Sequence, residues 1–573
     1  MITSKQLKNL KDRLWEGADQ LRANSGLKAT EYATPILGLI FLRFAESKYS
    51  QFEADIIAKY EKNKGTRTER PIHEIAIERC GYYLPLEARF EHLLNLPESE
   101  DLALATKTAM EKVEQYTVEL ADTLPKDIYY EVNSEDDPLV LAKLFRVFKD
   151  IPTDISLDIF GEIYEFFLGK FALAEGQGGG EFFTPSSVVR YMVEVLAPTE
   201  GEIFDPACGS GGMFVQAAHY VAHHADKGKD INLRAYGIEK VGATANLAKM
   251  NLVLNNVRGT ITNANSYYRD PYDSLGRFNY VMANPPFNVD DVELDQIKSQ
   301  PRFNMYGVPQ NKTKKAKGDA KETVPNANYL WINLFATSLN ENGRAALVMA
   351  NSASDAGHSE KDIRIKLIES GVISQVVTLP SNMFSSVTLP ATLWFFDRAK
   401  PKQDEILFID ARNIFTQISR AHRKFSNEQI KNIAIISRLY EGKTDEFVVL
   451  LEEYKAALAE APETSDDEDV PPKSYWQEQI DWLTERFPDG TYNDVVGLCK
   501  AAKLDGEDGI IDQDYSLNPG RYVGVVIEDD GMTEEEFKAE MLRINTELTT
   551  LNEEAHGLEK VIAENLRLLM GDA

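Results

Sequence analysis

From about residue 151 onward, short apolar runs alternate with stretches of helical periodicity, and this alternation constrains the fold more than any other feature of the chain. We expect strands at 202–204, 233–238, 260–262, 280–282, 345–349, 372–379, 391–396 and 405–409. Helices are expected between them at 213–221, 242–254, 329–339 and 361–370. This pattern is typical of an α/β, doubly wound sheet with helices on both faces. Ligands bind such sheets at the carboxyl ends of the strands.

The remainder of the 573-residue chain predicts further domains. Residues 1–150 show helical spacing, with an apolar stretch at 35–44 that is too short for a membrane and indicates a buried helix. We assign 151–415 to the α/β domain and 416–525 to a mixed helical region with an acidic, proline-bearing linker at 463–472. Residues 526–573 are expected to form a C-terminal partner-binding helix.

The C-terminal segment carries apolar residues that step alternately by four and three, a coiled-coil seam: Phe537, Met541, Ile544, Leu548, Leu551, Ala555, Leu558 and Ile562. Gly557 interrupts the seam. Two interpretations stay open. The helix binds another chain, or it packs on its own domain.

The first candidate site is Phe204-Asp-Pro-Ala-Cys-Gly-Ser-Gly-Gly212, between an expected strand and an expected helix. Its glycines allow a tight turn and close approach of a ligand, here to Gly209, Ser210, Gly211 and Gly212. No Gly-Lys-Ser/Thr follows, which disfavours a triphosphate. Asp205 places a carboxylate beside the loop, suited to a cationic ligand such as the amino or sulfonium group of S-adenosylmethionine. A purely structural turn is the alternative.

The second candidate is Glu239 in Gly237-Ile-Glu239, at the end of the next expected strand. An acidic residue about 20–30 residues after a glycine loop is placed to accept both hydroxyls of a ribose. The alternative is a solvated or helix-capping group.

The third candidate is Asn284-Pro-Pro-Phe287, after the strand that ends near residue 282. Pro285 and Pro286 stiffen the backbone. The Asn284 amide and the Pro285 carbonyl can then hold both hydrogens of an exocyclic amine, so that its lone pair faces an electrophilic methyl group, and Phe287 can stack on the base. The rate would come chiefly from alignment, and a duplex base must leave the helix to reach such a site.

A fourth motif, Glu181-Phe-Phe-Thr-Pro-Ser186, lies upstream of the first expected strand. Thr184 is expected as the N-cap and Pro185 in the first turn of a helix through residue 195. We interpret this turn, Glu181, Phe182, Phe183, Thr184, Pro185 and Ser186, as closing over the cofactor.

Together these motifs resemble those of the modification subunits of type I restriction–modification systems, which are amino-methyltransferases. Two further segments match in kind and order: Leu247-Ala-Lys-Met-Asn-Leu252 and Asn326-Ala-Asn-Tyr-Leu-Trp331. The resemblance covers about residues 5–397 and returns at Asn518-Pro-Gly-Arg-Tyr-Val523. It implies an all-α N-terminal domain, a Rossmann-like methyltransferase core that uses S-adenosyl-L-methionine, and a C-terminal helical segment.

By this resemblance, the chain methylates adenine N6 in double-stranded DNA at specific sites and protects host DNA from cleavage. Cofactor contacts are implied for Phe183, Thr184, Pro185, Ser210, Gly211, Gly212 and Glu239. Residues 284–287 would hold the adenine. One departure concerns the cofactor adenine, which many relatives bind through an acidic residue after the third strand. Here Asn265 stands in that stretch, and it can still accept a hydrogen bond but carries no charge.

The formal net charge of −29 is unusual for a chain that grips DNA, since phosphate binding needs a basic face. The resemblance supplies an explanation: a specificity subunit joins the C-terminal helices and provides much of the DNA contact. A second copy of this chain and a restriction subunit are the other expected partners. The basic insertion 312–321 is interpreted either as a phosphate contact or as a solvated loop.

No metal site and no membrane association are expected. His219 and His223 share a helix face, but no nearby cysteine or acid completes a ligand set. The three cysteines, Cys80, Cys208 and Cys499, form no CxxC pair, which fits a reducing cytoplasm. Three alternatives to the main interpretation remain: cytosine-N4 methylation, methylation of a protein glutamine, and a catalytically idle cofactor-binding scaffold.

Overall fold

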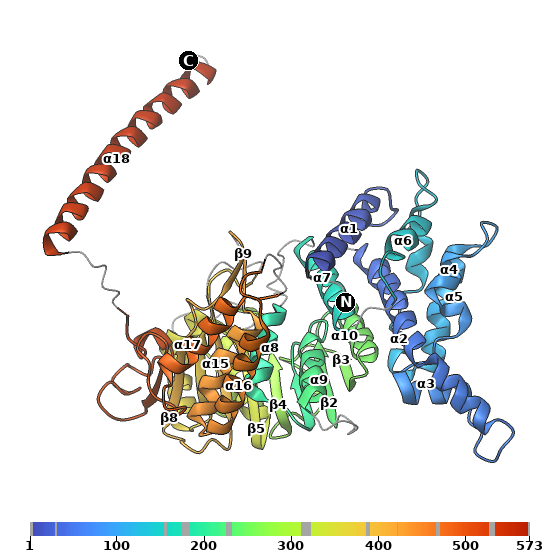
Figure 1. Ribbon diagram of the computed structural model, residues 1–573, viewed down its shortest axis with the longest axis horizontal. Helices are drawn as coiled ribbons and strands as arrows, with labels where there is room; N and C mark the ends of the chain where they lie inside the picture. Colours follow the sequence, from blue (N-terminus) through green and yellow to red (C-terminus); the bar gives the residue numbers. More distant parts are fainter. Residues whose placement is uncertain are drawn as a thin grey trace. The chain divides into compact units, whose positions relative to one another are not determined.

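The computed structural model describes residues 4–28, 31–153, 157–174, 184–224, 232–310, 322–384, 390–420, 422–465, 470–526 and 533–570. The chain divides into two units, Met1–Gly524 and Val525–Ala573 (Figure 1). The first unit contains a helical domain and an α/β domain. The second contains one long helix.

The helical domain is built around α2 (Ala33–Asn63), which is buried from Pro35 to Tyr49 and so contains the buried helix predicted at 35–44. Its other α-helices, drawn in blue and cyan in Figure 1, are α1 (Ser4–Arg22), α3 (Ile72–Cys80), α4 (Phe90–Leu94), α5 (Leu102–Tyr116), α6 (Val140–Phe148) and α7 (Leu157–Ala174). Three short 3-10 helices complete it: η1 (Leu86–Ala88), η2 (Val118–Leu120) and η3 (Asp127–Tyr130). The all-α expectation for the N-terminal part is confirmed.

The α/β domain contains a nine-stranded sheet in the order β11-β8-β6-β7-β5-β4-β1-β2-β3. Its strands are β1 (Gly201–Asp205), β2 (Leu233–Glu239), β3 (Arg258–Asn263), β4 (Phe278–Ala283), β5 (Leu339–Ala350), β6 (Ile373–Thr378), β7 (Ala391–Asp397), β8 (Glu405–Asp410) and β11 (Cys499–Lys503). Only β7 and β11 run antiparallel to their neighbours. The predicted doubly wound sheet is confirmed.

Successive residues of a strand point to opposite faces of the sheet, and here both faces are apolar. Helices therefore cover both faces. One face packs against α8 (Ser186–Leu196), α9 (Gly212–His224), α10 (Gly242–Leu254) and α15 (Asn427–Tyr440). The other face packs against α13 (Asn328–Ser338) and α14 (His358–Glu369). In β5, Ala346 and Val348 belong to the first core, and Leu347 and Met349 belong to the second. Shorter helices at the second face are α11 (Leu294–Ile297), α12 (Pro301–Asn304) and η4 (Asn351–Asp355).

Two expectations differ from the structure. Thr184 is not the N-cap of α8; Pro185 occupies that position, and no side chain caps the helix. Residues 416–525 contain not only α15, α16 (Thr444–Glu460), α17 (Lys473–Arg486) and η5 (Pro519–Arg521) but also strands. Strands β9 (Thr416–Ser419) and β10 (His422–Lys424) form a hairpin, and β11 adds to the edge of the main sheet beside β8. These strands were missed because they are short and carry polar and basic residues.

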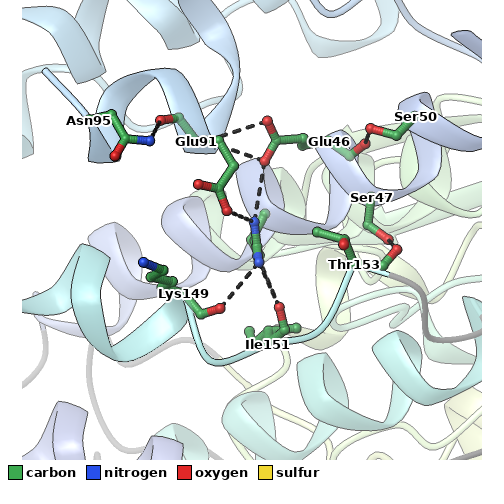
Figure 2. Close-up of polar contacts among 9 residues, drawn as sticks. Glu46, Ser47, Ser50, Glu91, Asn95, Lys149, Ile151 and Thr153 are labelled. Carbon is green, nitrogen blue, oxygen red and sulfur yellow. Dashed lines mark hydrogen bonds and ion pairs between the residues drawn. The ribbon is translucent and has the colours of Figure 1, made fainter.

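An ionic network around the buried Arg43 ties α2 to α4 and to the segment between α6 and α7. The Arg43 guanidinium donates to the Glu91 carboxylate at 2.9 Å and to the backbone carbonyls of Lys149 at 3.1 Å and Ile151 at 2.8 Å. Glu46 is its second acidic partner, at 3.4 Å. Figure 2 shows Glu46, Glu91, Lys149 and Ile151 converging on this point. Removing one member of such a network would leave a buried charge uncompensated.

Helix α10 is shared between the two domains. Its residues Ala245, Ala248 and Leu252 belong to the core on one face of the sheet. Met250, Val253 and Leu254 belong to the core of the helical domain. At the end of α10 the buried Lys48 ammonium donates to the Leu254 carbonyl at 2.7 Å, and burial lowers the pKa of Lys48 to about 8.

The second unit consists of α18 (Glu534–Met570), which continues through Gly557. Its seam residues are about half exposed, among them Phe537, Met541, Leu548, Leu551 and Ile562. The predicted C-terminal helical segment is confirmed.

Candidate active site

Three of the candidate side chains follow adjacent parallel strands. Strand β1 pairs with β4 on one side and β2 on the other, with Phe204 opposite Val281 and Asp205 opposite Gly237. Asp205 ends β1, Glu239 ends β2, and Asn284 follows the last residue of β4. The order of the strands reverses at β1 and β4, and crevices at such a switch point are where α/β sheets bind ligands. The side chains therefore share one edge of the sheet.

The glycine loop between β1 and α9 turns through backbone angles that favour glycine. Gly209 has φ 52° and Gly211 has φ 79°. The Gly209 amide donates to Glu239 Oε2 at 3.1 Å, and the Val241 amide donates to Glu239 Oε1 at 2.8 Å. These two hydrogen bonds tie the end of β2 to the glycine loop, and an ionised carboxylate can accept several donors at once.

Open space lies beside this loop. A Cβ atom built on Gly209 or Gly212 would meet no atom of the described residues within 4 Å. Gly237 contrasts with them, because its Cβ would lie 2.8 Å from Cys208 Sγ and 2.5 Å from a methyl group of Ile261. The loop glycines thus border a cradle that a ligand can fill, whereas Gly237 is required by close packing.

Asp205 is buried at the base of the loop, with 1% of its surface exposed. Its carboxylate accepts a hydrogen bond from the Ala207 amide at 2.9 Å. Burial raises the pKa of Asp205 well above its usual value, and the nearby Glu239 charge raises it further. A cationic group brought to this site would stabilise the ionised form.

Asn251, on α10, supports the loop from the opposite side. Its side-chain amide donates to the Ser210 carbonyl at 3.0 Å. Asn251 lies within the Leu247–Leu252 segment used for the resemblance, but no role was assigned to it from sequence. The signal for its role was an asparagine among the apolar positions of a helix. A buried amide needs a hydrogen-bond partner, which here is the Ser210 carbonyl.

The Asn284-Pro-Pro-Phe287 turn is held by packing and by the residue that follows it. Pro285 is buried, and Phe287 packs against the apolar cores on both faces of the sheet. Asn288 has φ 57°, a conformation that asparagine tolerates.

A second asparagine motif fastens Asn288. The Asn288 amide donates to Asn328 Oδ1 at 2.9 Å, and Asn288 Oδ1 accepts from the side chains of Asn326 and Asn328, each at 3.0 Å. These hydrogen bonds give Asn326 and Asn328 a structural role, because they fix the residue that follows the candidate catalytic turn. Asn288 itself was not predicted.

Asn265 lies two residues beyond the end of β3. Strand pairing places Asn263 opposite Glu239. Asn265 Oδ1 accepts from the Tyr267 amide at 3.0 Å, and the Ser266 hydroxyl donates to the Pro206 carbonyl at 2.5 Å. The segment is therefore tied to the glycine loop, and the Asn265 side-chain NH₂ remains able to donate.

Several predicted residues lie outside or at the margin of the described chain. Glu181, Phe182 and Phe183 are outside the described residues, as is the basic insertion 312–321. Thr184, Pro185 and Ser186 precede or begin α8, which shares an apolar core with α9. Within the described residues, no group of three histidine, cysteine or acidic side chains is placed to hold a metal. No described helix is long and apolar enough to cross a membrane.

Comparison with known proteins decides the family. A family model described as "N-6 DNA Methylase" matches residues 155–461, and one described as "HsdM N-terminal domain" matches residues 10–149. This chain belongs to the N-6 DNA methylase family. The first of these segments contains strands β1 to β8, which carry the candidate site, and the second covers most of the helical domain before it.

Relatives of this methylase match over nearly the full chain. The type I restriction enzyme MjaIX methylase subunit of Methanocaldococcus jannaschii is 33% identical, over 97% of this chain and 91% of its own. The HindI methylase subunit of Haemophilus influenzae is 30% identical, over 86% and 97%. A type I methyltransferase subunit from Streptococcus thermophilus has the same fold, with a TM-score of 0.65 and 20% identity over 90% of this chain and 99% of its own. The methylase is thus a type I modification subunit and an adenine-specific DNA methyltransferase, as predicted.

Proposed function

We propose that this methylase binds S-adenosyl-L-methionine at the ends of β1 and β2 and presents to it the amino group of an adenine extruded from duplex DNA. The observation that carries the proposal is the adjacency of β4, β1 and β2, which brings Asn284, Asp205 and Glu239 to one edge of the sheet. Methyltransferases of this family and fold use this cofactor, and the open space at Gly209 and Gly212 fits a ligand there.

Each cofactor-binding residue has a distinct role. When bound, S-adenosyl-L-methionine supplies an electrophilic methyl group. Glu239 would accept the ribose hydroxyls, because an ionised carboxylate offers about four acceptor positions. Asp205 would face the cationic part of the ligand, because a buried carboxylate is stabilised by an opposite charge. Asn265 would donate to the cofactor adenine through its side-chain NH₂.

The backbone and side chains of the glycine loop and of the α8 turn would enclose the remainder of the cofactor. This set comprises Gly209, Ser210, Gly211 and Gly212 of the loop and Glu181, Phe182, Phe183, Thr184, Pro185 and Ser186 of the turn. Gly209 and Gly212 border the open space, and Asn251 holds Ser210 in place.

Catalysis would come from alignment of the target amine. The Asn284 side-chain oxygen and the Pro285 carbonyl would accept its two hydrogens, and Phe287 would stack on the base. Pro285 and Pro286 limit backbone motion, and the Asn288–Asn326–Asn328 hydrogen bonds fix the end of the turn. Positioning two bound reactants in this way lowers the activation free energy of the reaction by several kcal/mol, and by about 7–11 kcal/mol at most.

We further propose that α18 binds a specificity subunit, with a second copy of this chain and a restriction subunit in the complete complex. The seam on α18 has the apolar spacing of a coiled coil, which favours a partner helix. A partner that reads the DNA sequence also accounts for the net charge of −29.

Two experiments test the proposed function. Isothermal titration calorimetry should show S-adenosyl-L-methionine binding to the chain alone. Long-read modification mapping should show N6-methyladenine at one defined DNA site in cells that express the chain with its neighbouring genes, and none when the chain is expressed alone. Site-specific methylation by the chain alone would contradict the role given to the partner.

A further inference from the structure

The hairpin formed by β9 and β10 carries a concentration of positive charge in an acidic chain. Residues 411–427 contain Arg412, Arg420, Arg423 and Lys424, together with His422, and no Asp or Glu. Arg412 is neutralised by Asp410, with an Nε–Oδ1 distance of 2.9 Å. Among the described residues, no carboxylate oxygen lies within 4.0 Å of the charged groups of Arg420, Arg423 or Lys424. Some other exposed cations of the first unit form ion pairs, for example Arg70 with Glu74 and Glu78.

This hairpin lies at the same edge of the sheet as Asn284. It follows β8, which runs parallel to β6, and both strands end on the side where β4 ends. The Arg423 amide donates to the Asn382 carbonyl at 2.9 Å, and its guanidinium donates to Ser381 Oγ at 3.0 Å, in the loop after β6. The label β9 in Figure 1 marks where the hairpin projects from the α/β domain.

The separation along the sheet suits contact with DNA around the target base. Three to four strand spacings separate β4 from β6 and β8, which is roughly 14–19 Å at ~4.8 Å per strand. One strand of a DNA duplex places a phosphate about every 3.4 Å along its axis. The hairpin would therefore meet phosphates about four to six positions from the base held at Asn284.

Part of the hairpin is preorganised for this contact. The Arg423 guanidinium lies 3.8 Å from the centre of the Phe415 ring and donates to Gln417 Oε1 at 3.1 Å. A guanidinium fixed in this way loses little freedom when it binds a phosphate. Arg420 and Lys424 are exposed beside it.

We propose that the β9–β10 hairpin is a DNA-backbone-binding element that holds phosphates next to the extruded adenine through Arg420, Arg423 and Lys424. The proposal rests on the proposed function, because it assumes that DNA enters the edge of the sheet that carries Asn284. It gives this acidic chain a local positive surface of its own, in addition to whatever a partner subunit supplies.

The test is a salt titration of DNA affinity on the full chain co-purified with its specificity subunit, using a short duplex that contains the methylation site. In the double variant Arg420→Ala, Lys424→Ala, the slope of log K against log [NaCl] should become shallower by about 1.8, because each phosphate that a cation neutralises accounts for about 0.9 of the slope. Affinity for S-adenosyl-L-methionine should not change. The matched control is Arg234→Ala, Arg258→Ala, two exposed arginines that pair across β2 and β3 at the opposite edge of the sheet. That variant should keep the wild-type slope.

The outcomes separate the two proposals. A wild-type complex that methylates DNA, with an unchanged slope in the hairpin variant, overturns the hairpin proposal and leaves the proposed function standing. Loss of the specificity subunit from the hairpin variant on purification also overturns it, because the hairpin would then be a protein-docking surface. A wild-type complex that neither binds nor methylates DNA overturns both.

Discussion

Glu239 Oε2 accepts a hydrogen bond from the Gly209 amide at 3.1 Å, which joins the end of β2 to the glycine loop after β1. The residue proposed to bind the cofactor ribose thus also shapes the loop proposed to enclose the cofactor. Strand pairing makes this contact a consequence of the fold, because Asp205 and Gly237 lie side by side just before it.

The Glu239→Gln variant should therefore bind S-adenosyl-L-methionine about tenfold or more weakly. One carboxylate oxygen becomes an NH₂ group, which cannot accept from a loop amide or a ribose hydroxyl, and each lost charge-assisted hydrogen bond is worth about 1.5–3 kcal/mol. Calorimetry measures the change. Glu202→Gln is the control, because Glu202 pairs with Arg277 near the start of β1. Equal affinities in wild type and Glu239→Gln would contradict the assignment.

Asp205 links cofactor binding to protein stability. Its pKa is well above the usual value in the folded protein, so the folded state keeps a proton that the unfolded chain loses near pH 4. Stability therefore falls as the pH rises from the unfolded pKa through the folded pKa. Asp205→Asn cannot ionise, and the cofactor-free variant should melt roughly 2 °C or more above wild type at pH 7, with no difference below about pH 4.

The same variant should bind S-adenosyl-L-methionine about tenfold or more weakly, since the ligand's cation loses its carboxylate partner. Binding of S-adenosylhomocysteine, which keeps the amino group but lacks the sulfonium, tells which cation Asp205 faces. Equal losses for the two ligands indicate the amino group. A variant that is less stable than wild type at pH 7, or that binds the cofactor normally, would show the role of Asp205 to be structural.

The seam of α18 should be required for assembly but not for cofactor binding. Leu548→Glu, Leu551→Glu places two charges on the exposed apolar stripe and should abolish co-purification of the specificity subunit. Thr546→Glu, Thr550→Glu, on the same helix but off the seam, should leave assembly intact. Pull-down on the tagged chain measures both. Retention of the partner by the seam variant would place the interface elsewhere.

Most of the α/β domain could be predicted from sequence because its buried strands contain continuous apolar runs, as at 345–349 in β5 and 393–396 in β7. Their alternation with helices determines which residues follow strand ends. Asp205, Glu239 and Asn284 were recognised for this reason. Strand β11 was not, because an edge strand such as Cys499-Lys-Ala-Ala-Lys503 has no such run.

Residues that act through long-range contacts could not be predicted. Asn251 meets Ser210 across 41 positions of sequence, and Asn288 meets Asn328 across 40. Both pairs depend on packing that only the folded chain provides. The N-cap prediction for Thr184 was wrong for a different reason. Threonine is a suitable N-cap residue and precedes the helix, but α8 begins after Pro185.

The most direct test of the account is mass spectrometry of nucleosides from DNA of cells that express the complete complex with wild-type or Asn284→Ala chain. We predict N6-methyladenine with the wild type and none with Asn284→Ala, while calorimetry shows that the variant still binds S-adenosyl-L-methionine within about twofold, since Asn284 is assigned to the target base. N6-methyladenine in the Asn284→Ala sample, or N4-methylcytosine in the wild-type sample, would contradict the claim that this turn holds an adenine amine for methylation.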